Sequence, residues 1–203
     1  MLEWIPFGRP DPQSWRALGQ GLAALHRVSR DSFGWERDNS IGATPQVNAP
    51  NTDWAAFFRD RRLGFQLRLA QRQGYGGRLQ RQGERLLAEL GRFFESHHAR
   101  PALLHGDLWN GNAGFDAAGQ PVIFDPAVYY GDREADLAMT ELFGGFGEDF
   151  HAAYRADFPL DPGYAVRKTL YNLYHVLNPL NLFGGGYLRQ AEGMADELLA
   201  ELG

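Results

Sequence analysis

The sequence contains no cysteine, and lysine occurs only once, at Lys168, among 20 basic residues. The absence of cysteine excludes a disulfide framework and a zinc site built from thiolates, and it fits a reducing compartment. No apolar run approaches the roughly 18 residues that a membrane-spanning helix requires. The N-terminal segment carries an early Glu3 and Pro6 and lacks the apolar core of a signal peptide, so we expect a cytoplasmic protein.

Positive charge is also scarce. The formal net charge is −5, and no block of basic residues alternates with aromatic ones. Proteins that bind nucleic acid usually carry a basic surface, because it neutralises the phosphates. We therefore expect neither nucleic acid nor a membrane among the partners.

Apolar residues are plentiful enough for a real core: 44% of the 203 residues are hydrophobic and 13% are aromatic. Their spacing predicts a single domain over residues 1–203 of mainly helical α+β class. Asp11, Thr52 and Asp132 are the expected N-caps of three of its helices. Residues 29–51 show no clean period. The predicted helices cover residues 11–28, 52–67, 79–97, 132–142, 166–178 and 188–202, and short strands occupy a β insertion at 101–127.

Two polar motifs in that insertion indicate chemistry. They are His-Gly-Asp-Leu-Trp-Asn-Gly-Asn at 105–112 and Val-Ile-Phe-Asp-Pro at 122–126. An acid, an asparagine five residues later, and a second acid closing the next apolar run have the order base, metal ligand, metal ligand of phosphoryl-transfer enzymes. Asp107 is therefore the candidate base, and Asn112 and Asp125 are candidate ligands of Mg²⁺, which implies MgATP as cofactor.

Other interpretations of these residues exist. Asp107, Asn110 and Asn112 also belong to the residue types that form turns for local backbone reasons. A two-metal phosphoesterase also uses such acids, but it normally has more histidine ligands nearby. His105 is expected to orient the loop by hydrogen bonding, and Gly106 to permit a tight turn.

Together with segments elsewhere in the chain, these motifs resemble the fructosamine kinase (ketosamine-3-kinase) family, a branch of the aminoglycoside-phosphotransferase-like kinases. The resemblance implies ATP-dependent phosphorylation of a sugar hydroxyl on a ketosamine, the adduct of glucose or ribose with an amine. A kinase of another small molecule, of aminoglycoside or choline type, is the alternative within the fold. The segments that carry the resemblance are 22–26, 39–42, 46–48, 105–112, 124–139, 174–178 and 181–184.

The resemblance also implies roles for residues around the motifs. Trp109 would line the sugar pocket or simply pack. Asp136 would support the catalytic loop by accepting its backbone N–H groups, or else be a solvated helix acid. His175, Asn178 and Asn181 share a similar helix face, and they would contact the substrate or satisfy one another in the core.

The family fold is protein-kinase-like, and this chain resembles its C-terminal lobe, a helical bundle whose small β-hairpin insertion carries the catalytic loop. Residues 1–7 resemble the hinge between the lobes, so Glu3, Trp4 and Ile5 are expected to bind the nucleotide. The β-rich N-terminal lobe and its ATP-binding lysine are expected to be absent, since Lys168 lies late in the chain. We expect either an active kinase seen as its large lobe or a non-catalytic binding module, and little activity from these 203 residues alone.

Overall fold

The computed structural model describes residues 4–203, which form eight α-helices and six short strands. The predicted mainly helical α+β class is confirmed. The helices are α1 (Pro12–Leu25), α2 (Trp54–Phe58), α3 (Gly64–Arg72), α4 (Arg78–Glu89), α5 (Glu134–Thr140), α6 (Glu148–Asp157), α7 (Tyr164–Phe183) and α8 (Leu188–Leu202). The strands are β1 (Asn39–Ile41), β2 (Thr44–Gln46), β3 (Ala102–Leu104), β4 (Ala113–Phe115), β5 (Pro121–Ile123) and β6 (Tyr129–Gly131).

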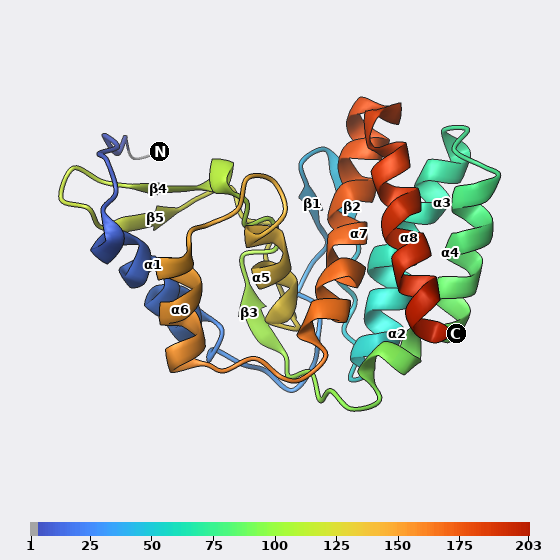
Figure 1. Cartoon of the computed structure of the whole chain (residues 1–203), viewed down its shortest axis with the longest axis horizontal. Helices are drawn as coiled ribbons and strands as arrows, with labels where there is room; N and C mark the ends of the chain where they lie inside the picture. Colours follow the sequence, from blue (N-terminus) through green and yellow to red (C-terminus); the bar gives the residue numbers. More distant parts are fainter. Residues whose placement is uncertain (1–3) are drawn as a thin grey trace.

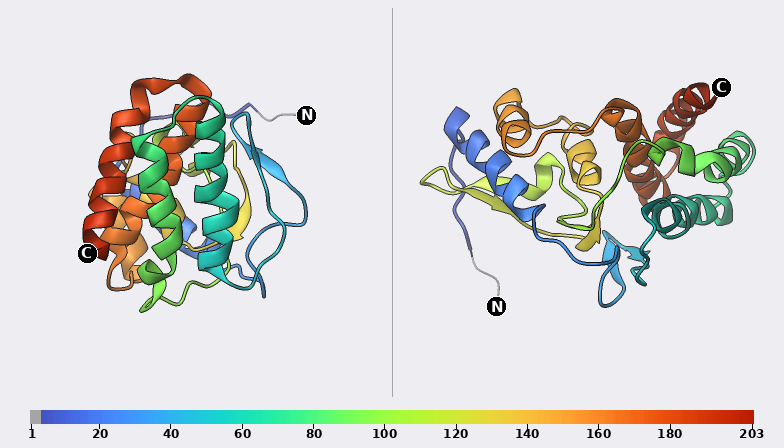
Figure 2. Two further views of the ribbon diagram at one scale, coloured as in Figure 1. Left: turned by 90° about the vertical axis from the view of Figure 1, so that its right-hand side faces the viewer. Right: turned by 90° about the horizontal axis from the view of Figure 1, so that it is seen from below.

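Two hydrophobic cores hold these elements together. Figure 1 shows the helices around them, with α1 and α6 at one end and α3, α4, α7 and α8 at the other. The larger core lies among α2, α3, α4, α7 and α8, and Figure 2 shows α3, α4 and α8 side by side. The smaller core joins α1 and α6 through residues such as Leu22 and Phe150. Helix α5 contributes to both, because Ala138 faces the larger core and Leu137 the smaller. The loop 105–112 lies between the two cores, since Leu104 belongs to the larger one and Leu108 to the smaller.

The strands form three separate two-stranded antiparallel sheets, β1–β2, β3–β6 and β4–β5. The prediction of a single β insertion at 101–127 was therefore incomplete. Strand β6 lies just beyond it, and the hairpin β1–β2 lies in the stretch 29–51 that showed no period. Each strand has only three residues, which is too short for an alternating pattern to be recognised.

The helix predictions need corrections near their ends. Asp11 caps α1 as predicted, accepting a hydrogen bond from Ser14 N at 2.7 Å. Thr52 is not the cap of α2, because the Asp53 side chain accepts from Ala56 N at 3.1 Å. The continuous helix expected to Leu67 is instead interrupted by a π-helical turn, Arg59–Leu63, which places the Arg62 side chain in the interior.

Further corrections concern the C-terminal half. Asp132 precedes the N-cap of α5, Arg133, although its carboxylate still accepts from Glu134 N at 3.1 Å. Helix α6 was missed, since its ten residues bury only Phe150 and Tyr154. Helix α7 is longer than the predicted 166–178 and continues through Pro179. The predicted helix 79–97 ends at Glu89 and is followed by a 3₁₀ turn over Leu90–Phe94.

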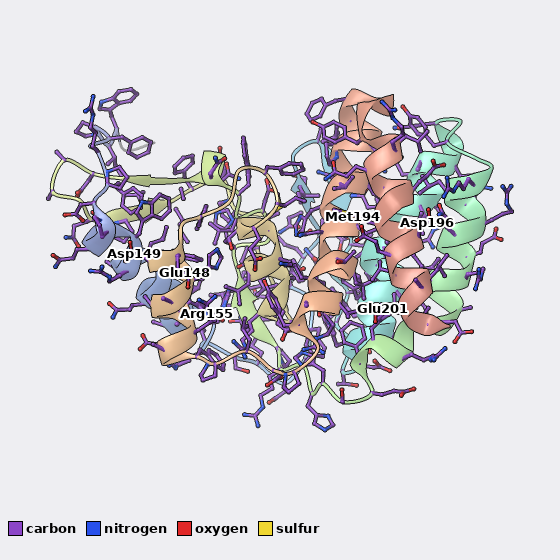
Figure 3. The ribbon with its side chains drawn as sticks, viewed as in Figure 1. Glu148, Asp149, Arg155, Met194, Asp196 and Glu201 are labelled. Carbon is purple, nitrogen blue, oxygen red and sulfur yellow. The ribbon has the colours of Figure 1, made fainter. Side chains whose placement is uncertain are left out.

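Charged side chains cover the outer faces of the helices. Figure 3 shows Glu148, Asp149 and Arg155 on α6, and Asp196 on α8. Arg155 forms an ion pair with Glu148, and Arg78 forms one with Asp196. Such exposed pairs contribute little to stability, because water screens the attraction between the charges. None of the described helices combines the length and apolar character needed to cross a membrane.

Candidate active site

The loop 105–112 leaves strand β3 and enters β4 through a 3₁₀ turn at Asn110–Asn112. Its first turn requires glycine. Gly106 has a φ of +83°, and a Cβ atom at this position would lie 2.1 Å from the carbonyl oxygen of Ala127. The backbone of the loop therefore approaches the segment after β5 more closely than any side chain would allow.

Asp136, on α5, holds the start of this loop. Its buried carboxylate accepts hydrogen bonds from His105 N at 2.7 Å and Gly106 N at 2.8 Å, and it lies 3.2 Å from His26 Nε2. Burial alone would raise the pKa of Asp136, but the hydrogen bond and charge of His26 and the bond from Gly106 keep that pKa below its usual value. This is the arrangement expected of a residue that supports the loop.

His105 links the loop to the second motif. Its Nε2 donates to the carbonyl oxygen of Phe124 at 2.8 Å, and its Nδ1 accepts from Asp107 N at 3.3 Å. Both ring nitrogens are thus used in hydrogen bonds to the backbone. The geometry agrees with an orienting role.

Asp107 lies in the middle of the loop with its carboxylate partly buried. Asn112 Nδ2 donates to Asp107 Oδ2 at 3.2 Å and to its carbonyl oxygen at 2.9 Å. Burial raises the pKa of Asp107 to about 6, and the negative charges of Asp136 and Asp125 act in the same direction, against His105 and Asn112. A carboxylate with a pKa near 6 is well matched to accept a proton at neutral pH.

Asn112 lies beside the segment that carries Asp125, because Phe124 N donates to the carbonyl oxygen of Asn112 at 3.1 Å. Because Asn112 Nδ2 is engaged by Asp107, its Oδ1 is the amide atom left for a cation. Asp125 follows β5 with a φ of +52°, the only non-glycine residue of the described chain with positive φ. Its exposed carboxylate forms no ion pair with any residue that the structure describes. An amide oxygen and a carboxylate are the ligand types that Mg²⁺ prefers.

A cavity of about 390 Å³ opens beside Asp107. The predicted substrate residues Trp109, His175 and Asn178 all line it, together with an apolar wall that includes Met139 and Phe143. The indole of Trp109 lies directly over Gly111, where a Cβ atom would approach the ring to 2.3 Å. Burial lowers the pKa of His175 to about 4, so this imidazole is neutral at physiological pH.

The polar face of α7 lies partly at the cavity and partly in the core. His175 and Asn178 reach the cavity, whereas Asn181 lies in the core and donates to Gln66 Oε1 at 2.7 Å and to its carbonyl oxygen at 3.0 Å. Gln66 Nε2 in turn donates to Asn178 Oδ1 at 3.1 Å. Gln66 therefore fixes the orientation of the Asn178 amide, a role that the sequence did not reveal.

Of the three residues predicted to bind nucleotide, the structure describes Trp4 and Ile5. Glu3 lies outside the described residues. Trp4 is 89% exposed and Ile5 is half-buried, and neither lines the cavity beside Asp107. In the same N-terminal segment, the ring of Phe7 stacks on that of Phe124, with centroids 5.7 Å apart.

The comparisons with known proteins agree over almost the entire chain. The model of the family described as fructosamine kinase matches residues 1–201. This chain belongs to the fructosamine kinase family. A Synechocystis protein named ketoamine kinase is 50% identical over 98% of this chain and 67% of its own length. An Arabidopsis thaliana protein-ribulosamine 3-kinase, named as chloroplastic, is 43% identical over 100% of this chain and 62% of its own length.

Solved structures give the same result. A Thermobifida fusca structure that carries the name fructosamine-3-kinase superposes with a TM-score of 0.91 at 34% identity, over 98% of this chain and 69% of that one. The complex of APH(2″)-IIa with gentamicin superposes over 98% of this chain and 68% of that one with a TM-score of 0.55 at 16% identity, which shows a shared fold alone. The predicted kinase-like fold is thereby supported, and the assignment of this chain to one lobe stays a prediction.

The fructosamine kinase motif at 39–48 has a clear structural place. Gln46 Nε2 donates to the carbonyl oxygen of Ala127 at 3.0 Å, and Asn39 Nδ2 donates to that of Val128 at 2.8 Å. Tyr174 OH, on α7, donates to Gln46 Oε1 at 3.1 Å. The hairpin β1–β2 therefore holds the backbone that follows Asp125. The motif is recognisable in the sequence, but its hydrogen bonds join residues that are too far apart in the chain for the sequence to reveal them.

Proposed function

We propose that the protein phosphorylates a sugar hydroxyl of ketosamines, with MgATP as phosphoryl donor and Asp107 as base. The observation that carries this proposal is the partly buried Asp107 carboxylate, held by Asn112 at the edge of a cavity lined by Trp109, His175 and Asn178. The names of the relatives, ketoamine kinase and protein-ribulosamine 3-kinase, support the substrate class. Because the chain spans 62% and 67% of those two relatives, the activity of a whole protein is part of the proposal.

Asp107 would act on the acceptor hydroxyl. As the hydroxyl oxygen forms its bond to the γ-phosphorus, Asp107 takes up the proton, and the bond between the γ-phosphorus and the bridging oxygen breaks to leave ADP. The hydrogen bond from Asn112 Nδ2 to Oδ2 orients the carboxylate. Asn112 Oδ1 and Asp125 would hold Mg²⁺, which when bound neutralises charge on the phosphate oxygens.

The cavity would hold the ketosamine. The face of Trp109 suits the C–H surface of a sugar and the cationic amine, and Asn178 offers an amide whose orientation Gln66 fixes. His175 is neutral, so it can exchange hydrogen bonds with hydroxyls without repelling that amine. A set of one carboxylate and neutral polar groups favours a polyhydroxylated monocation over a polycation, which separates this proposal from an aminoglycoside substrate.

The nucleotide would bind on the side of Asp107 that faces away from the ketosamine cavity, against the β4–β5 hairpin. Phe7, 57% exposed, and Ile123, 37% exposed, provide apolar surface on which an adenine ring can lie. Gly8 N donates to Phe115 O at 2.8 Å and so holds this segment along β4. Glu3, Trp4 and Ile5 precede it and stay candidates for the contact with adenine.

The direct test is a kinase assay on the protein encoded by the complete reading frame. ADP release is measured with fructosamines and ribulosamines of simple amines as acceptors. We expect Mg²⁺-dependent turnover with these acceptors and none with choline or an aminoglycoside. Ketosamine binding by calorimetry without any ADP release would contradict the proposed reaction and favour a binding module. Turnover with the other acceptors alone would contradict the substrate class.

Asp125→Ala is expected to weaken binding of MgATP at least tenfold, because a carboxylate ligand of the metal is lost. Ketosamine affinity should stay within about twofold of the wild type, since Asp125 does not line the cavity. Calorimetric titration with each ligand measures both effects. Asp31→Ala, at an exposed acid in the loop after α1, is the control for loss of surface charge. Unaltered MgATP affinity in Asp125→Ala would remove Asp125 from the metal site.

A further inference from the structure

A second cluster of ionisable side chains is not used by the proposed reaction. It consists of His97, after the 3₁₀ turn that follows α4, Asp132 and Glu134 at the start of α5, Asp161 in the connection between α6 and α7, and Arg167 on α7. All except Asp161 are buried, with exposed fractions of 5% or less. Four separate segments of the chain therefore meet at His97.

His97 uses only one of its two ring nitrogens in a hydrogen bond. Its Nε2 lies 2.7 Å from Asp132 Oδ2, and Asp132 also accepts from Tyr171 OH at 2.6 Å and from Glu134 N at 3.1 Å. Asp132 is therefore a fully engaged anion that accepts a hydrogen bond from Nε2–H of His97. With that proton on Nε2, a neutral His97 directs the lone pair of Nδ1 to the other side of the ring.

On that other side, Nδ1 faces two carboxylates. Asp161 Oδ2 lies 2.8 Å away and Glu134 Oε1 lies 4.0 Å away. Nδ1 nevertheless belongs to the buried side-chain atoms without a hydrogen-bond partner among the described residues. A buried nitrogen that is unpartnered and faces two carboxylates is in a position to share a cation with them.

The charges of the cluster are unbalanced. Asp132, Glu134 and Asp161 carry three negative charges, and Arg167 compensates one of them through bonds of 2.7 and 3.0 Å to Glu134. Burial opposes a charge on His97, but the hydrogen bond and charge of Asp132 and the charge of Glu134 raise its pKa, so a proton on Nδ1 offsets part of this charge while no cation is bound. A metal ion that displaces this proton meets a sum of about two negative charges. One divalent ion would bring the sum to zero.

We propose that His97 Nδ1, Glu134 and Asp161 bind one divalent transition-metal ion, with Zn²⁺ the best match. The three ligand atoms lie within 4.8 Å of one another, and two ligands that share an ion at about 2.1 Å are at most about 4.2 Å apart. Neighbouring ligands of a tetrahedral ion lie about 3.4 Å apart, so Glu134, now 4.0 Å from His97 Nδ1, and the exposed Asp161 side chain would each move toward the ion by roughly an ångström. The exposure of Asp161 also leaves room for water as a further ligand.

The ligand types select the metal. An imidazole nitrogen with two carboxylates suits Zn²⁺, whereas Mg²⁺ prefers oxygen ligands throughout. The bond between His97 Nε2 and Asp132 is the support that metal-bound histidines usually have on their second nitrogen. Bound metal would tie the α6–α7 connection to the start of α5, so we expect it to stabilise the fold without taking part in phosphoryl transfer.

The test is calorimetric titration of the metal-stripped chain with ZnCl₂ in a buffer that does not chelate zinc, together with thermal unfolding. We expect one equivalent of zinc to bind with a Kd in the micromolar range or below and to raise Tm, and Mg²⁺ at the same concentration to do neither. His97→Gln and Asp161→Asn should each weaken zinc binding at least tenfold. Asp161 is exposed, so its variant tests the site even if His97→Gln fails to fold.

Matched controls separate this site from other zinc binding. His98 is adjacent but exposed, and His98→Gln should bind zinc as the wild type does. Asp125→Ala should keep the same stoichiometry, which excludes binding at the proposed Mg²⁺ site. The proposal is overturned if zinc does not bind saturably at about 100 µM, if Asp161→Asn binds as tightly as the wild type, or if His98→Gln loses binding.

Discussion

Asp107→Asn is expected to lower kcat for ketosamine phosphorylation by about 10³-fold and, at the same time, to make the folded chain more stable at pH 7. Loss of the proton acceptor accounts for the fall in rate, within the range typical of general bases. The gain in stability follows from the raised pKa of Asp107, because burial makes the ionised carboxylate unfavourable. The rate is measured by ADP release and the stability by urea unfolding.

The stability gain has a definite dependence on pH. The pKa of Asp107 is about 6 in the folded chain and near 3.8 when exposed, so the stabilising effect of the protonated group is complete below 3.8 and is lost as pH rises through about 6. The amide introduced by Asp107→Asn would carry no charge at any pH. The free energy of unfolding of the variant should therefore match that of the wild type below about pH 4 and exceed it by about 3 kcal/mol at pH 7.

The effect on kcat and the effect on stability can be checked separately. Asp31→Asn changes an exposed acid and should alter neither the rate nor the pH dependence of unfolding. An Asp107→Asn enzyme with unchanged kcat would remove Asp107 as the base. Equal stability of the variant and the wild type at every pH would instead contradict the buried, raised-pKa environment, whatever the rate.

What the sequence predicts best is the order of groups within short motifs. Asp107 and Asn112 are five residues apart, and the turn between them brings them into hydrogen-bond contact. Asp136 was predicted as a support from its place in the family motif, and its bonds to His105 and Gly106 have that form. Local geometry and motif order thus determine much of the loop.

What the sequence does not predict depends on contacts between distant segments. Gln46 reaches Ala127 across 81 positions, and Gln66 reaches Asn178 across 112. A glutamine has the same local preferences whether it is exposed or buried in such a network, so nothing in its neighbours reveals the partner. The same holds for His97, whose carboxylate neighbours Asp132, Glu134 and Asp161 come from two other segments of the chain, and for the three-residue strands of β1–β2.

The second large effect is expected at Asp136, where Asp136→Asn should destabilise the folded chain by about 3–5 kcal/mol, the cost of breaking a buried charged interaction. An asparagine keeps one acceptor oxygen but turns an NH₂ group toward one of the three donors, His105 N, Gly106 N or His26 Nε2. Because the pKa of Asp136 is lowered in the folded state, its contribution is present above the usual carboxyl pKa and is lost as pH falls through the folded value. Urea unfolding at pH 7 and at acid pH measures both.

Glu141→Gln provides the comparison at the C-terminal end of the same helix, where Glu141 pairs with Lys168 at 2.6 Å with side chains 29% and 34% exposed. That pair should contribute at most about 1 kcal/mol, because water screens it. If Asp136→Asn costs no more than Glu141→Gln, the carboxylate does not hold the loop. If Asp136→Asn is strongly destabilised, the fraction that stays folded should also show reduced kcat with little change in KM, because Asp107 is displaced while Trp109, His175 and Asn178 still bind the sugar. A rise in KM with unchanged kcat would instead place the effect of Asp136 in the substrate cavity.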